Sequence, residues 1–340
     1  MDAGLRPGLG GVRGWRIGQD ENPDDAGAAL FAFRNEPFRS NLAKNGSLRP
    51  MIEIDARLVE DLIAEQFPEW SSLPVSAVAS SGWDNRSFRL GDAYVVRLPS
   101  AARYAGQVEK EQTWLPVLAQ YLPVSIPRPA ARGVPGCGYP FAWSVYTWLP
   151  GETAAIATIT YRIAFAQQLA GFIHALHRIN PSGAPVPGGG TFHRGGPIRF
   201  YDAEAREAIG RLDPGWNRSA LLAIWEEGAF TTWNRPSLWV HGDLSPGNLL
   251  VEKGRLSAVI DFGLICAGDP ACDFAIAWSF FDTDERGAFL DVLKPDDTAW
   301  MRGRCWALWK AALLASGLSQ SNAYEMAAAA NTLNRILKDS

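Results

Sequence analysis

Cysteine, histidine and long apolar runs are all scarce in this chain of 340 residues. Its four cysteines are scattered with no Cys-x-x-Cys pair, which excludes a zinc ribbon or a disulfide framework and is typical of a reduced, cytoplasmic protein. The four histidines include no His-Glu-x-x-His pattern of a zinc protease. No apolar run approaches the ~18 residues of a membrane span, and none begins the chain as in a secretory signal. We therefore expect a cytoplasmic protein without a membrane partner.

A strong charge of either sign is missing as well. The 32 Lys and Arg residues against 36 Asp and Glu residues give a formal net charge of −4. No run of basic residues stands out, so nucleic acid is not expected as a partner. The slight acidic excess is compatible with a cationic small substrate, but it is weak evidence on a chain of this length. Nothing in the composition indicates the oligomeric state.

The first fifty residues differ from the rest of the chain. They are rich in glycine and polar residues and show little hydrophobic periodicity, so we expect residues 1–50 to form a mostly disordered extension. From Met51 onward a helical spacing of apolar side chains begins. The remainder of the chain is long enough for two lobes with a sizeable core.

The most informative feature lies in the second half, where polar residues follow short apolar stretches. Residues 241–248 read HGDLSPGN, and residues 260–263 read IDFG. The apolar stretches around them predict three strands, of which the last two, separated by a polar turn with a glycine, form a β-hairpin over 249–260. The loop before this hairpin and the end of its second strand would then present their polar side chains together.

Asp243, Asn248 and Asp261 supply the oxygen atoms that phosphoryl transfer from a metal-bound nucleotide needs. The acceptor hydroxyl must be oriented and must lose its proton, which is a task for the Asp243 carboxylate as catalytic base. Mg²⁺ prefers oxygen ligands and takes only one or two from protein, so Asn248 and Asp261 are the predicted metal ligands. Either motif alone is common by chance. In this order, with a hairpin of suitable length between them, they favour a kinase-like site.

These motifs resemble those of the aminoglycoside phosphotransferase family, which belongs with choline kinases to one branch of the kinase fold. Gly242 stands where protein kinases have an arginine, and residues 268–273 (GDPACD) match a further motif of the family. In that motif Asp273 is expected to cap a helix and to brace the catalytic segment. The resemblance covers residues ~70–315, with uncertain ends.

The resemblance implies an α+β fold of the two-lobed protein-kinase type. Its small N-lobe is built on an antiparallel sheet and is expected at 51–150, and its larger helical C-lobe is expected at 151–340. The implied reaction moves the γ-phosphoryl group of ATP or GTP, with Mg²⁺, to a hydroxyl of a small molecule. Antibiotic resistance is not implied, because the wider family also phosphorylates choline, homoserine, sugars and macrolides, and the sequence does not identify the acceptor. Glu226 and Glu227 are acidic candidates for acceptor contacts, although a solvated helix face explains them as well.

The kinase-like order of elements assigns nucleotide-binding roles in the N-terminal half. Ser81 and Gly82 lie in a polar turn between two predicted strands, where backbone N–H groups would lie over the nucleotide phosphates. Arg97, on the following strand, takes the place of the lysine that holds the phosphates in kinases. On the next helix, Glu111 is expected to pair with Arg97, and Glu109 is the fallback.

The aromatic stretch 142–149 is expected to be the last strand of the N-lobe and to lead into the linker between the lobes. Backbone groups near Tyr146, Trp148 and Leu149 would then meet the adenine edge, although Trp148 is equally compatible with a place in the core. The alternative to an active kinase is a catalytically weak nucleotide-binding protein with a scaffold or regulatory role, and Arg97 in place of lysine is the feature that suggests it.

Overall fold

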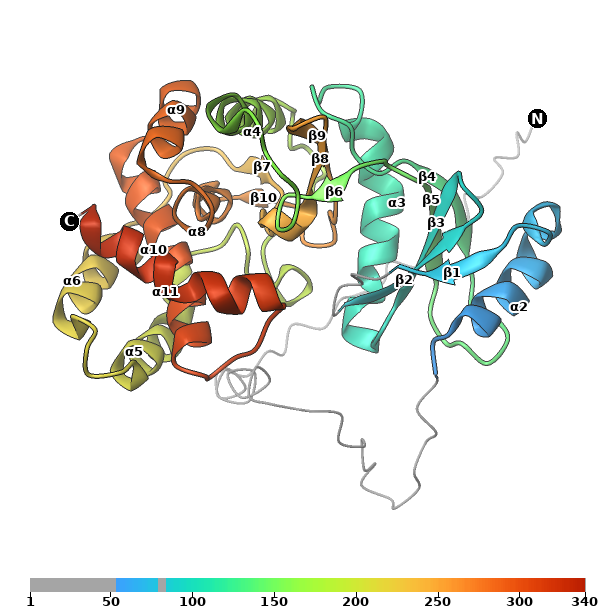
Figure 1. Ribbon diagram of the computed structural model, residues 1–340, viewed down its shortest axis with the longest axis horizontal. Helices are drawn as coiled ribbons and strands as arrows, with labels where there is room; N and C mark the ends of the chain where they lie inside the picture. Colours follow the sequence, from blue (N-terminus) through green and yellow to red (C-terminus); the bar gives the residue numbers. More distant parts are fainter. Residues whose placement is uncertain (1–52, 79–83, 340) are drawn as a thin grey trace, which may run out of the picture. The chain divides into compact units, whose positions relative to one another are not determined.

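The computed structural model describes residues 53–78 and 84–339. The extension predicted at 1–50 and the turn residues Ser81 and Gly82 lie outside these described residues. The described part forms a smaller lobe built on a sheet and a larger, mainly helical lobe (Figure 1).

The smaller lobe is built on a five-stranded antiparallel sheet in the order β1-β2-β3-β5-β4. Its strands are β1 (Val75–Ala77), β2 (Asn85–Leu90), β3 (Tyr94–Pro99), β4 (Pro129–Gly133) and β5 (Trp143–Thr147). Two helices accompany the sheet, α2 (Ala56–Gln66) beside β1 and α3 (Gly106–Leu118) on the side of the larger lobe (Figure 1).

Strand alternation decides which side chains of this sheet face α3. Val96 and Leu98 are fully buried and pack in a core cluster with apolar side chains of α2. Because successive side chains of a strand point to opposite faces, Arg97 between them points away from α2 and reaches α3. Pro116 lies inside α3 without ending it, since the helix runs on to Leu118.

The larger lobe holds the main hydrophobic core. Its helices are α4 (Arg162–His177), α5 (Asp202–Arg211), α6 (Arg218–Ala229), α7 (Ala271–Phe274), α8 (Ile276–Ser279), α9 (Thr283–Leu293), α10 (Asp297–Ala315) and α11 (Ala323–Lys338). The predicted amphipathic helix at the start of the lobe is α4, which buries Phe165, Leu169 and Phe172 in the core and packs along α9. None of the described helices is long and apolar enough to cross a membrane.

Two small sheets position the catalytic segment. One pairs β7 (Leu238–Val240) with β10 (Cys266–Gly268), and the other has the order β6 (Glu152–Thr153), β8 (Leu249–Glu252), β9 (Arg255–Val259). Strands β8 and β9 form the predicted antiparallel hairpin. The loop that contains Asp243 therefore runs from the end of β7 to the start of β8, and Asp261 follows β9 directly.

Some elements were not predicted from the sequence. They are β4, β6, β10 and α9, three short strands that lack a clear alternation and one helix of mixed composition. The expectation that Asp273 caps a helix is wrong, because Asp273 lies inside the short helix α7 and the cap position belongs to Pro270. Its carboxylate instead accepts hydrogen bonds from the backbone of the loop that follows β7.

Candidate active site

The backbone of the catalytic loop is held by one buried carboxylate. Asp273 Oδ2 accepts from the backbone N–H of His241 at 2.7 Å, and its Oδ1 accepts from that of Gly242 at 2.8 Å. Gly242 has a positive φ of 85°, and a Cβ added there would lie 2.9 Å from the carbonyl oxygen of Leu264. Only glycine therefore fits at this position without strain, which gives the sequence difference from protein kinases a steric cause in this chain.

His241 supports the loop from inside. Its Nδ1 accepts from the backbone N–H of Asp243 at 3.2 Å, and its Nε2 lies 3.0 Å from the carbonyl oxygen of Ile260. An N–H donor at Nδ1 and a carbonyl acceptor at Nε2 are satisfied together by the neutral ring with its proton on Nε2. His241 thus joins the loop before the hairpin to the residue before Asp261.

Asp243 and Asn248 meet at the two ends of this loop. The Asn248 amide nitrogen donates to the backbone oxygen of Asp243 at 2.9 Å and to its carboxylate Oδ2 at 3.2 Å. These bonds turn the amide nitrogen toward Asp243 and leave the amide oxygen for another partner. The side chain of Asp243 stays partly exposed, as a base that must reach an acceptor requires.

Asp261, which follows β9 in the larger lobe, contacts Arg97 of the smaller lobe. Its φ of 68° is in the left-handed region, which non-glycine residues adopt rarely and which is enriched at functional sites. Its Oδ1 accepts from Arg97 Nη2 at 2.8 Å, while Arg97 Nη1 donates to Glu111 at 3.2 Å. One guanidinium therefore bridges the helix carboxylate predicted as its partner and the carboxylate predicted as a metal ligand. Glu111 also accepts from the Tyr146 hydroxyl.

The charges in this cluster favour an ionised Asp261. Burial raises the pKa of its carboxyl group, but the Arg97 guanidinium outweighs burial and holds that pKa below its ordinary value. Arg97 in turn remains charged, since Asp261 and Glu111 together overcome the effect of burial and raise its pKa. An ionised carboxylate is the form that a divalent cation needs.

Glu109, the fallback partner for Arg97, is placed elsewhere. Its carboxylate pairs with Arg132 on β4 at 2.6 Å, and both side chains are largely exposed. Glu111 is only 4% exposed. Helix α3 thus presents Glu111 to Arg97 and Glu109 to solvent.

Asp84 lies near Asp261 and Arg97, and it was not predicted as a site residue from the sequence. Burial, together with the nearby carboxylate of Asp261, raises its pKa from 3.8 to about 6, and Asp243 adds to this effect. These charge effects place Asp84, which directly precedes β2, near Asp243 and Asp261, the predicted base and metal ligand. Its position beside the turn with Ser81 and Gly82 was visible in the sequence, but its proximity to the second lobe depends on tertiary structure.

Lys110 joins α3 to two segments of the larger lobe. Its ammonium donates to the carbonyl oxygen of Gly263 at 2.6 Å and to that of Gly190 at 3.1 Å. One turn earlier, Gln107 packs against Gly263 so closely that a Cβ there would lie 2.7 Å from its side chain. The segment after Asp261 is thereby held against α3 from two positions.

The predicted adenine-binding residues have mixed surroundings. Tyr146 is buried and directs its hydroxyl to Glu111, so its side chain supports the Arg97 cluster. The backbone N–H of Trp148 donates to Ala93 O at 2.7 Å and is not available to a base. Its ring lies under the guanidinium of Arg89, 3.9 Å from the ring centroid, rather than in the core. Leu149 follows it at the junction of the lobes and is partly exposed.

A cavity of about 70 Å³ lies next to Asp243, the predicted base. Asp243 and Ser245 of the loop line this cavity. Side chains from three other regions line it as well: Arg194 from the loop before α5, Trp306, Trp309 and Lys310 from α10, and Tyr324 and Glu325 from α11. Glu226 and Glu227 do not line it, so their expected contacts with an acceptor stay a prediction. Glu226 instead forms an exposed pair with Arg206 at 2.9 Å. We refer to this space as the acceptor-side cavity.

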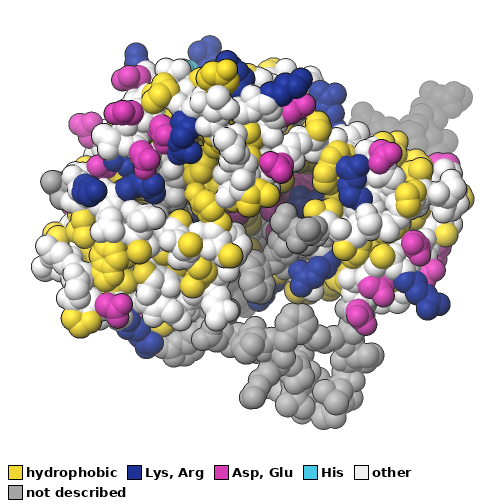
Figure 2. Space-filling view, viewed as in Figure 1, with side chains coloured by type: hydrophobic (Ala, Val, Ile, Leu, Met, Phe, Trp, Pro, Cys, Tyr) yellow, Lys and Arg dark blue, Asp and Glu magenta, His cyan; other side chains and the backbone are white. Residues whose placement is uncertain are grey.

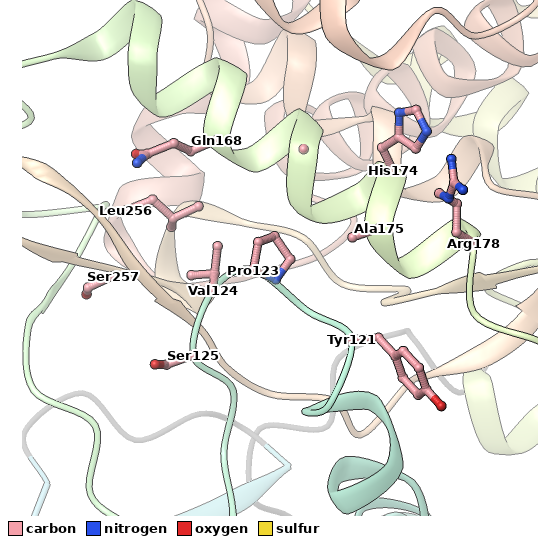
Figure 3. A pocket seen from close by; sticks show the side chains of 11 residues that line it. Tyr121, Pro123, Val124, Ser125, Gln168, His174, Ala175, Arg178, Leu256 and Ser257 are labelled. Atoms are coloured by element: carbon pink, nitrogen blue, oxygen red, sulfur yellow. The ribbon is translucent and has the colours of Figure 1, made fainter.

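A larger cavity of about 700 Å³ lies away from the catalytic residues (Figure 3). It is lined by α4, β9 and the segment 121–125, and His174, Arg178 and Tyr121 project around it (Figure 3). None of the residues predicted for catalysis or nucleotide binding belongs to its lining. Chemistry, rather than size, therefore identifies the smaller cavity as the one beside the reaction centre.

Comparison with known proteins agrees with this geometry. Residues 76–306 match the sequence pattern of the phosphotransferase enzyme family, abbreviated APH, over more than half of the chain. The chain belongs to the phosphotransferase enzyme family. Within this family, it is 28% identical over 150 residues to an aminoglycoside 3'-phosphotransferase of Salmonella typhimurium, a match that covers 41% of this chain and 52% of that protein. The chain thus spans about half the length of the curated relatives it matches.

Solved structures of phosphotransferases share the fold. The GDP complex of aminoglycoside 2'-phosphotransferase-IIIa superposes with a TM-score of 0.65 at 20% identity, over 84% of this chain and 99% of that one. The macrolide 2'-phosphotransferase MphH of Brachybacterium faecium gives a TM-score of 0.52 at 22% identity, over 82% and 98% of the two chains. The predicted two-lobed kinase-like architecture is confirmed.

Proposed function

We propose that this phosphotransferase moves the γ-phosphoryl group of ATP or GTP to a hydroxyl group of a small molecule. The observation that carries the proposal is the convergence of Asp243, Asn248 and Asp261 from two motifs, with Arg97 bridging Asp261 to Glu111. Phosphoryl transfer needs positioned charges of this kind more than covalent chemistry. The GDP complex of an aminoglycoside 2'-phosphotransferase with the same fold supports a nucleotide as the donor.

Asp243 would accept the proton of the acceptor hydroxyl as its oxygen attacks the γ-phosphorus. The hydrogen bond from Asn248 holds the carboxylate in place, and the Asp273 carboxylate braces the loop by accepting from the backbone N–H groups of His241 and Gly242. Arg97 lies where it can hold the donor phosphates and is itself held by two carboxylates. Each group acts by position and charge, which is the largest contribution in reactions of this class.

The residues of the cleft fit Mg²⁺. Asn248 offers its amide oxygen because its nitrogen is occupied by Asp243, and Asp261 offers an ionised carboxylate. Among the described residues no group of three or more His, Cys, Asp or Glu side chains could hold a metal alone, which suits an ion that takes its other ligands from phosphate and water. When bound, the ion would neutralise charge that develops on the phosphates.

A catalytically weak scaffold is not favoured. Arg97, the feature that suggested it, contacts Glu111, its predicted partner, and also the carboxylate of Asp261. We further propose a cytoplasmic location, where Mg²⁺ and nucleoside triphosphates are available.

On the face shown in Figure 2, basic and acidic side chains are interspersed, which gives no support to nucleic acid as a partner.

The proposal is tested by a transfer assay with purified protein, Mg²⁺ and either ATP or GTP. The acceptor panel contains sugars, hydroxy acids, amino alcohols, macrolides and aminoglycosides. We expect nucleoside diphosphate to form in proportion to a phosphorylated acceptor, and this transfer to fall about 10²–10⁴-fold in Asp243→Asn. Glu226→Gln is the control, because Glu226 is an acidic residue outside the cavity. Acceptor-dependent transfer that is equal in both variants would contradict the role of Asp243.

A further inference from the structure

The acceptor-side cavity contains an arginine that the proposed reaction has not used. Arg194 reaches the cavity from the loop that precedes α5, and it packs against the catalytic loop, since a Cβ added at Gly242 would lie 3.2 Å from Arg194 Cβ. Its own backbone is braced: Arg194 N donates to Thr191 O at 3.0 Å, and Cys266 Sγ donates to Arg194 O at 3.1 Å. The position of this side chain is therefore built into the fold.

Two indole rings support the guanidinium. The Arg194 Cζ atom lies 4.7 Å from the ring centroid of Trp306 and 4.9 Å from that of Trp309. Its hydrogen-bonding neighbours are uncharged: the carbonyl oxygen of Phe192 at 3.5 Å and the hydroxyl of Tyr201. Among the described residues Arg194 forms no ion pair with a carboxylate. The carboxylates of Glu204 and Glu325 are near enough to interact with its charge but form no direct ion pair with it. A guanidinium stacked on aromatic faces without a direct carboxylate partner is well suited to bind an oxyanion.

The other charged groups of the cavity are already committed. Lys310 pairs with Glu325 at 2.7 Å, and Glu325 also accepts from Ser321. Glu204, behind the cavity wall, accepts from Trp309 Nε1 at 2.8 Å. Asp243 is reserved for the reacting hydroxyl. No carboxylate lining the described cavity is thus left to bind the ammonium groups of a polycationic acceptor.

The size of the cavity points in the same direction. Its volume of about 70 Å³ is well below the ~300–1,000 Å³ of pockets that enclose drug-sized ligands. The space beside Asp243 therefore suits a small molecule, or a small part of a larger one. Indole and alkyl groups line much of the cavity, and Arg194 adds a cation without a direct carboxylate partner. This lining suits a compact hydroxy acid better than a multi-ring polyamine.

We propose that the acceptor is a small hydroxyl compound that carries a carboxylate or another oxyanion, and that Arg194 binds this group. The inference rests on the proposed phosphoryl transfer and specifies its acceptor class. Polycationic aminoglycosides are then poor acceptors, because Arg194 repels them and the carboxylates at the cavity are occupied.

The oxyanion could also come from the donor, since a transferred phosphoryl group passes close to Asp243. The two sources differ in kinetics. An Arg194 that binds the acceptor affects the KM of acidic acceptors and leaves that of uncharged ones almost unchanged. An Arg194 that stabilises the phosphoryl group lowers kcat for every acceptor alike.

The experiment compares matched acceptors that differ in charge: glucose, glucuronate and glucosamine, glycerol and glycerate, and homoserine, with kanamycin as a polycation. We expect the highest kcat/KM among the acidic or zwitterionic compounds. Arg194→Gln should lower kcat/KM for those about 10- to 100-fold, as expected for the loss of one charge-assisted contact. It should change glucose and glycerol less than about threefold. Arg206→Gln, an exposed arginine paired outside the cavity, is the matched control.

Other outcomes separate the two levels of the argument. Preferred transfer to kanamycin or glucosamine would overturn the acceptor class while supporting the proposed function. An equal loss of kcat for all acceptors in Arg194→Gln would assign Arg194 to the phosphoryl group and overturn the proposal. If no acceptor is phosphorylated, the proposed function fails. Thermal shifts then decide on Arg194: glucuronate or glycerate must raise Tm in the wild type but not in Arg194→Gln, and equal shifts would overturn its role.

Discussion

Arg97→Lys tests the bridge that joins the two lobes at the nucleotide site. In the structure two different nitrogens of Arg97 serve two carboxylates: Nη1 donates to Glu111 at 3.2 Å and Nη2 donates to Asp261 at 2.8 Å. A lysine has one compact ammonium, which can keep one of these contacts at good geometry but not both. We therefore expect the variant to remain folded and to lose one charge-assisted hydrogen bond.

The size of the effect follows from burial. Arg97 and Asp261 are 14% and 22% exposed and Glu111 is 4% exposed, so the lost contact is only partly screened. One such bond contributes about 1.5–3 kcal/mol, or roughly 10- to 100-fold in an equilibrium or rate constant. If the bridge binds the phosphates, as proposed, and also places Asp261, kcat should fall and the nucleotide KM should rise together.

The assay pairs urea unfolding with steady-state kinetics. Glu111→Gln and the double variant complete a mutant cycle, and their combined cost should be smaller than the sum of the single costs because both act through one interaction. Arg132→Lys is the matched control: its pair with Glu109 is largely exposed and should contribute no more than about 1 kcal/mol. Strict additivity for the Arg97 and Glu111 variants, or nucleotide kinetics unchanged in Arg97→Lys, would refute the reasoning.

Two further predictions concern the carboxylates of Asp273 and Asp84. Asp273→Asn leaves one of the two catalytic-loop amides facing an N–H₂ group instead of an acceptor, so unfolding free energy should fall by about 1–3 kcal/mol and kcat should drop with little change in nucleotide KM; an unaltered kcat would contradict the bracing role. Asp84→Asn tests the pKa of about 6. Because the folded pKa lies above the ordinary 3.8, the folded protein holds this proton more tightly. The stability so contributed is present below about pH 4 and is lost as the pH rises to about 6. The variant should therefore gain stability relative to the wild type as the pH rises through this range, by at most about 3 kcal/mol. Urea unfolding at pH 4.5 and 7.5 should show a clearly larger difference between the variant and the wild type at the higher pH.

The sequence allowed prediction of those parts of the site that are local in the chain. The hairpin 249–260 and the motif residues Asp243, Asn248 and Asp261 follow from patterns within a short segment, so their spacing limits the geometry. The pairing of Arg97 with Glu111 was expected from the resemblance to kinases, in which a helix carboxylate holds the phosphate-binding cation.

The acceptor-side cavity was not predictable in the same way. Arg194, Lys310 and Glu325 come from three regions that are distant in sequence, and no local pattern reports that they share a wall. Trp306 and Trp309 lie in a helix that is buried on most sides, so their spacing indicates core as readily as a binding surface. The sequence shows that Glu226 and Glu227 are acidic but not which way their side chains face. In the structure Glu226 pairs with Arg206 at an exposed position.

The most direct test of the account follows the fate of the γ-phosphoryl group. Wild-type protein and Asp243→Asn are incubated with Mg²⁺, a nucleoside triphosphate labelled in its γ-phosphoryl group, and the best acceptor of the panel. For the wild type we predict label in a phosphate ester on an acceptor hydroxyl, equal in amount to the nucleoside diphosphate formed. In Asp243→Asn nucleotide binding should persist while the ester forms about 10²–10⁴-fold more slowly. Label that appears only as inorganic phosphate, or an ester formed equally fast without the Asp243 carboxylate, would contradict the account.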